Sequence, residues 1–224
     1  MMMNLRRSKR VARLVMDAPS IVLASLVYSG VIHLSSLRAD LLDIVDPWWV
    51  VSIGLVLLLS PMIHIFVIGK VDSMSRHESF PLHALPFETF GDLVLGELLV
   101  NAVVVLGSAI FLLPGIYVGI RSIYYKQMII LHKARPVDAI RASFQLTADS
   151  RVMFRVFLLL AVSYCLPLAI DYLLSPATQA WWIHPIGILV SASFIAWINV
   201  YVTVWFGDLM ADDRGTTASD QLSS

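Results

Sequence analysis

Histidine and acidic side chains that could bind a metal lie close together in one short segment. His77 and Glu78 are followed by His83. A zinc protease motif, H-E-x-x-H, needs two histidines four residues apart on one helix. Here the spacing differs, and Pro81 and Pro86 break the helix that would have to align the ligands. We therefore expect no metal site in this segment.

Other catalytic motifs are missing from the sequence. It contains no G-x-S-x-G elbow, no phosphate-binding P-loop and no dinucleotide-binding fingerprint. We therefore predict no catalytic residue, no cofactor and no metal, and we do not expect an enzyme.

Two cations inside an apolar run are more informative. Arg121 and Lys126 interrupt the apolar window 114–131. Each costs about 2.5–3.5 kcal/mol at the centre of a membrane helix, so each needs a partner inside the protein or access to water. If the chain folds back before this window, Lys126 lies level with Asn101, and Glu97 lies about one turn closer to the inner surface.

We therefore predict that Lys126 pairs with Glu97, and that Arg121 reaches outward toward Asp171. We interpret these groups as structural ion pairs or interfacial anchors, with a proton or substrate pathway as the alternative. The candidate intramembrane polar cluster consists of Arg121, Lys126, Glu97, Asn101 and Asp171.

The composition explains why these charges matter. Of 224 residues, 58% are hydrophobic and 14% are charged, with a mean hydropathy of +0.79. Soluble domains have about 45–50% apolar and about 25% charged residues, so the composition is typical of a membrane protein. The net charge is zero, which gives no indication of nucleic-acid binding. The single cysteine, Cys165, excludes an internal disulfide.

Six apolar windows are long enough to cross about 30 Å of hydrocarbon. They are residues 21–37, 48–68, 93–113, 114–131, 156–174 and 181–206. We interpret the first as a retained signal anchor, because no small-residue cleavage site follows it. The predicted fold is all-α: one polytopic transmembrane helix bundle over residues 1–206, followed by a polar disordered tail at 207–224.

The distribution of basic residues favours all six crossings. With both termini in the cytoplasm, nearly all lysines and arginines outside the windows fall on the inner side, and the outer side holds Arg38 alone. If window 114–131 did not cross, the cations from Lys133 to Arg155 would face outward, against the positive-inside rule.

A short amphipathic helix is predicted between the fourth and fifth windows. Pro136 suits the first turn of a helix, and apolar residues follow at helical spacing. We expect this helix to lie on the inner membrane surface. The segment either only sets the topology, through its basic residues, or contacts lipid or a partner protein. The candidate lipid- or partner-facing surface consists of Lys133, Arg135 and Arg141.

Two parts of this region resemble a known family. The stretch LPGIY at 113–117 with Arg121, and the stretch AIRASFQLT at 139–147, are similar to motifs of the YciC-like bacterial inner-membrane proteins, which are related to the membrane domain of some glycerophosphodiester phosphodiesterases. The resemblance covers about 35 residues. It implies a six-helix protein of the bacterial inner membrane and carries over no hydrolase activity. His132 and Phe144 depart from the commoner acidic residue and tryptophan.

Two classes of function remain open. The first is a non-catalytic scaffold, assembly or envelope-homeostasis factor, whose partners are the lipid bilayer and other membrane proteins, with no nucleic acid. The second is a small permease or transporter subunit with a polar site formed by Arg121, Lys126, Glu97 and Asn101. The oligomeric state does not follow from the sequence.

Overall fold

The structure is a computed structural model that describes residues 2–39, 47–78, 87–110, 112–174 and 183–222. Within these ranges the chain is all-helical and holds no strand. The helices are α1 (Met2–Asp17), α2 (Pro19–Ala39), α3 (Pro47–Arg76), α4 (Phe87–Ile110), α5 (Leu112–Arg121), α6 (Tyr125–His132), α7 (Pro136–Leu146), α8 (Ser150–Leu174) and α9 (Ile183–Leu222). The predicted all-α class is therefore confirmed.

Several of these helices have the length and apolar character of membrane spans. The described segments that qualify are Gly54–Arg76 in α3, Phe87–Ile110 in α4 and Ile188–Ala211 in α9. A fourth is obtained if Arg7–Asp17 and Pro19–Val31, which meet at an angle of 83°, are taken as one broken span. The chain thus has three or four candidate spans in its described part, as a membrane protein does.

The predicted window 114–131 is not one continuous helix. Helix α5 ends at Arg121, a turn follows at residues 122–124, and α6 begins at Tyr125. Hydropathy cannot reveal this break, because the residues around it, including Arg121 and Lys126, are compatible with a helix and hold no proline or glycine between residues 120 and 131. The break exists because side chains of α7 take over backbone hydrogen bonds there.

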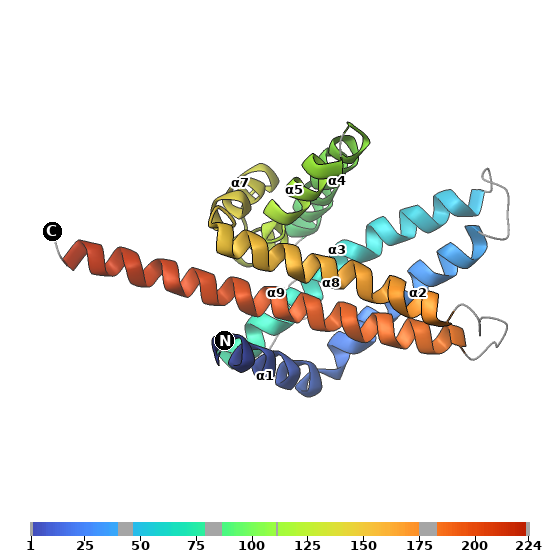
Figure 1. Cartoon of the computed structure of the whole chain (residues 1–224), viewed down its shortest axis with the longest axis horizontal. Helices are drawn as coiled ribbons and strands as arrows, with labels where there is room; N and C mark the ends of the chain where they lie inside the picture. Colours follow the sequence, from blue (N-terminus) through green and yellow to red (C-terminus); the bar gives the residue numbers. More distant parts are fainter. Residues whose placement is uncertain (1, 40–46, 79–86, 111, 175–182, 223–224) are drawn as a thin grey trace.

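Helix α9 extends past residue 206, where the predicted bundle ended and the predicted polar tail began. Helix α9 continues to Leu222, and Leu209 and Met210 pack against the hydrophobic core. Asp208 forms an ion pair with Arg7 at 2.7 Å. Figure 1 shows the C-terminal end of α9 extending beyond the other helices.

Helix α9 joins two hydrophobic clusters. One lies among α1, α2, α3 and α9 around Val11, Ile21 and Val200, and the other includes residues from every helix from α3 to α9, around Tyr124 and Phe206. Different faces of α9 serve the two clusters, and α8 runs beside it (Figure 1). This arrangement leaves α4 and α5 as a projecting hairpin.

The hairpin depends on two glycines at a close helix contact. A Cβ atom added to Gly107 would lie 3.0 Å from the backbone nitrogen of Gly115. A Cβ added to Gly115 would collide with Ser108 Oγ and lie 2.7 Å from the carbonyl oxygen of Val104. Small residues allow this kind of approach between membrane helices, where packing replaces the hydrophobic effect.

We expect Gly115→Ala to separate α4 from α5 and to lower the free energy of unfolding by about 1–3 kcal/mol, the usual cost of overpacking. The matched control is Gly119→Ala in the same helix, where an added Cβ meets nothing within 4 Å. That change should be neutral or slightly stabilising, because alanine favours helix over glycine. Thermal unfolding in detergent measures both, and equal destabilisation by the two variants would contradict the packing argument.

Candidate functional site

The predicted pair between α4 and α6 is present. Lys126 Nζ lies 2.8 Å from Glu97 Oε1. The side chain of Glu97 is 7% exposed, whereas that of Lys126 is 22% exposed. Both residues lie in apolar helices, where a charge without a partner would be costly. The pair therefore fixes the distance between α4 and α6.

Helix α3 adds two polar residues, Ser60 and His64, which are not among the five residues of the predicted cluster. Ser60 Oγ donates a hydrogen bond to Glu97 Oε1 at 3.0 Å. Lys126 Nζ lies 3.1 Å from His64 Nε2, and His64 Nδ1 lies 2.7 Å from the carbonyl oxygen of Ser60. We call these four residues, Ser60, His64, Glu97 and Lys126, the polar network.

One assignment of protons satisfies the histidine. His64 Nδ1 donates to the carbonyl oxygen of Ser60, and Nε2 accepts from the ammonium of Lys126. The neutral imidazole then needs no further partner. The signal for His64 in the sequence was its position in an apolar window, but its approach to Lys126, 62 residues later, is a tertiary contact.

The polar network does not have the geometry of a hydrolytic triad. In a triad the histidine accepts from the serine through one nitrogen and donates to the carboxylate through the other. Here Nδ1 is the nitrogen nearer to both Ser60 Oγ, at 3.3 Å, and Glu97 Oε1, at 3.7 Å. The serine hydroxyl donates to Glu97 directly. The arrangement suits a structural link among three helices.

The remaining members of the predicted cluster lie elsewhere. Asn101 is exposed on α4, one turn beyond Glu97, and Arg121 has its own contacts beside α7. The side chain of Asp171 lies outside the described residues, so its pairing with Arg121 stays a prediction. The structure thus brings together two of the five predicted residues.

Arg121 is held by contacts with α7 and with Thr147, the residue that caps this helix. Its Nη1 donates to the carbonyl oxygen of Thr147 at 2.7 Å. Its guanidinium carbon lies 5.6 Å from the ring centroid of Tyr117 and 5.3 Å from that of Phe144. Such cation–π contacts contribute about 0.5–2 kcal/mol each, more where water is excluded.

Side chains of α7 also satisfy the broken backbone. Ser143 Oγ donates to the carbonyl oxygen of Arg121 at 2.8 Å and accepts from the backbone N–H of Tyr124 at 3.0 Å. Thr147 Oγ1 lies 3.2 Å from the same carbonyl oxygen. Ser143 and Thr147 are fully buried. We call Arg121, Ser143 and Thr147 the clasp.

The α7 helix is confirmed, and its buried face can now be described. It runs from Pro136 to Leu146, with proline in its first turn as predicted. Ala139 and Ser143 are buried against the protein, whereas Val137 is 58% exposed. The face at Ala139 and Ser143 therefore packs inward.

The candidate surface beside α7 is accessible. Lys133, Arg135 and Arg141 are exposed, and Lys133 ends α6 in the left-handed conformation with φ of 51°. No ion pair involves these three cations within the described part of the chain. They are available to bind an anionic surface or partner.

No known protein-family model, curated protein or solved structure matches this chain. The geometry around Glu97, Lys126 and Arg121 is therefore the main guide to function.

We expect Glu97→Gln or Lys126→Met alone to lower the free energy of unfolding by about 2–3 kcal/mol. Breaking a fully buried pair costs about 3–5 kcal/mol, and the partial exposure of Lys126 reduces this cost. The double variant should recover part of the loss, because neither charge is left alone. The control Asn101→Ala, on the exposed face of α4, should change stability by less than about 0.5 kcal/mol. Additive losses in the double variant would contradict the pairing.

We expect Ser143→Ala to destabilise the protein by about 2 kcal/mol, because the buried N–H of Tyr124 loses its acceptor and the carbonyl of Arg121 loses a donor. Ser193→Ala is the control. Its hydroxyl is exposed and bonds only to the carbonyl oxygen of Leu189 in its own helix. Hydrogen exchange at residues 121–125 should rise in Ser143→Ala and stay unchanged in the control. Unchanged exchange in both variants would show that the clasp does not hold the break.

Proposed function

We propose that this chain is a non-catalytic multi-pass protein of the bacterial inner membrane that acts as a scaffold, assembly or envelope-homeostasis factor. The observation that supports this proposal best is the self-contained polar network. Glu97 accepts from both Lys126 and Ser60, and His64 lies between Lys126 and the backbone. A transport site would need such groups to face a water-accessible path. Paired with one another, they stabilise a bundle.

The proposed topology has six spans and cytoplasmic termini. The broken pair α5 and α6 would form the fourth crossing, with the break at residues 122–124 closed by the clasp. Irregular backbone is tolerated at membrane depth where protein side chains satisfy it. In this topology Lys133, Arg135 and Arg141 face the cytoplasm, which agrees with the positive-inside rule.

The resemblance to YciC-like proteins is part of the same proposal. Residues from both motif stretches contact one another: Tyr117 and Arg121 from the first, and Ser143, Phe144 and Thr147 from the second. Because the two stretches contact each other at the break between α5 and α6, there is a physical reason for both to be present in the same protein. This supports the resemblance as one of fold.

The alternative is a small permease or transporter subunit. It would use Arg121, Lys126, Glu97 and Asn101 around one polar path. The position of Asn101 on the exposed side of α4 and the separate contacts of Arg121 favour the scaffold instead.

The topology can be tested by cysteine labelling in a Cys165→Ser background. With an impermeant maleimide on intact spheroplasts, Arg38→Cys should be labelled and Arg141→Cys should not. After lysis both should react, since Arg141 is exposed. Labelling of Arg141→Cys in intact spheroplasts would refute the six-span topology.

The scaffold and transport hypotheses predict different results for paired variants of the full chain. If the chain is a scaffold, Arg135→Gln with Arg141→Gln should reduce the stoichiometry of proteins that co-purify in mild detergent, whereas the control Arg151→Gln with Arg155→Gln should not. Reconstituted liposomes containing a pH-sensitive dye should show no proton flux. A flux that disappears in Glu97→Gln, with intact co-purification in every variant, would favour the transporter.

A further inference from the structure

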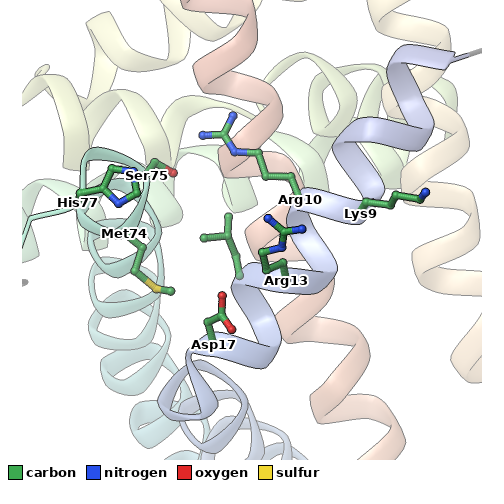
Figure 2. A pocket seen from close by; sticks show the side chains of 8 residues that line it. Lys9, Arg10, Arg13, Asp17, Met74, Ser75 and His77 are labelled. Atoms are coloured by element: carbon green, nitrogen blue, oxygen red, sulfur yellow. The ribbon is translucent and has the colours of Figure 1, made fainter.

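A basic pocket opens between α1 and the end of α3, away from the polar network. Its volume is about 630 Å³, within the range of about 300–1,000 Å³ typical of small-molecule sites. Figure 2 shows Arg10 and Arg13 on α1 on one side of the pocket, with Ser75 at the end of α3 and His77 just after it on the other side. Lys9 also lines the pocket, and its amino group points away from α3 in this view.

The walls of this pocket are fixed by contacts outside it. Arg7 Nε lies 2.7 Å from Asp208 Oδ2, and its guanidinium lies 5.5 Å from the ring centroid of Trp205. Val11 is fully buried on the same helix. Helix α1 is therefore anchored to α9, which fixes the backbone positions from which the exposed basic side chains of the pocket extend.

The cations of the pocket are largely unneutralised. Arg10 Nη1 lies 3.8 Å from Asp208 Oδ1 and remains half-exposed. Within the described residues, Lys9 and Arg13 form no ion pair. Asp17 is the one carboxylate among the lining residues, so the pocket keeps an excess of positive charge. Arginines at such positions bind phosphate through paired N–H donors.

If α3 crosses a bilayer, the pocket lies near the level of the phospholipid headgroups. It borders the C-terminal end of the membrane-length segment Gly54–Arg76, and α1 meets α2 at 83°. If α2 and α3 cross the bilayer, α1 lies along its surface. Leu14 and Met74 add apolar lining beside the cations, which suits the glycerol and the first acyl carbons of a lipid.

We propose that this pocket binds a phosphate ester, held by Arg10 and Arg13, with Asp17, Ser75 and His77 available to a hydroxyl of the same ligand. The source that best fits its position is the headgroup of an anionic glycerophospholipid such as phosphatidylglycerol. A soluble phosphate ester shares the same chemistry and is the other source to be tested. This site is distinct from the surface formed by Lys133, Arg135 and Arg141 and does not depend on the scaffold role.

The test uses the full chain in neutral detergent, with thermal unfolding measured against added phosphatidylglycerol, phosphatidylcholine, glycerol 3-phosphate or inorganic phosphate. The pocket variant is Arg10→Gln with Arg13→Gln. A cation near an anionic lipid surface contributes about 1 kcal/mol, or about fivefold in affinity, so this variant should weaken phosphatidylglycerol binding about 25-fold. Arg13→Gln alone leaves the contact between Arg10 and Asp208 in place and should weaken it about fivefold.

The matched control is Arg151→Gln with Arg155→Gln, which removes the same charge from exposed positions on α8. Stabilisation by phosphatidylglycerol but not phosphatidylcholine, lost in the pocket variant and kept in the control, supports the lipid headgroup. The same pattern with glycerol 3-phosphate but not phosphatidylglycerol supports the site with a soluble ester as the ligand, whereas stabilisation by inorganic phosphate alone shows a site for free phosphate and overturns the proposed ester. Equal weakening in both double variants, or stabilisation by none of the four additions, overturns the proposal.

Discussion

A charge inside an apolar bundle must meet a partner, and the contact between Lys126 and Glu97 meets that requirement for α4 and α6. At 2.8 Å, with Ser60 and His64 contributed by α3, it ties together three helices that are far apart in the sequence. Removing either partner would leave a buried charge uncompensated. The position of α6 against α3 and α4 depends on this contact.

The clasp solves a second problem of the same kind. A break in a helix leaves backbone groups without their helical partners, and where these groups are buried they need other partners. Ser143 and Thr147 replace the missing helical partners, while Arg121 bonds back to the carbonyl oxygen of Thr147. This exchange of hydrogen bonds makes α7 part of the bundle, and it leaves Lys133, Arg135 and Arg141 exposed beside it.

The buried charges of the polar network and the clasp are separate from the exposed charges near α1 and α7. The polar network and the clasp use their donors and acceptors internally, whereas the basic side chains near α1 and α7 remain available to anions. The proposed scaffold role uses the surface at α7, and the proposed phosphate-ester site uses the pocket at α1. In both proposals the buried groups provide rigidity, and recognition is assigned to the exposed cations.

The sequence by itself determined the class of protein, the helix at Pro136, and the pairing of Lys126 with Glu97. Composition, proline preference and the cost of an unpaired charge are local or global properties that need no coordinates. Only the tertiary structure decided that His64 and Ser60 join that pair, that Asn101 stays outside it, and that window 114–131 breaks after Arg121. These outcomes depend on which helix faces approach, and a one-dimensional hydropathy pattern does not contain that information.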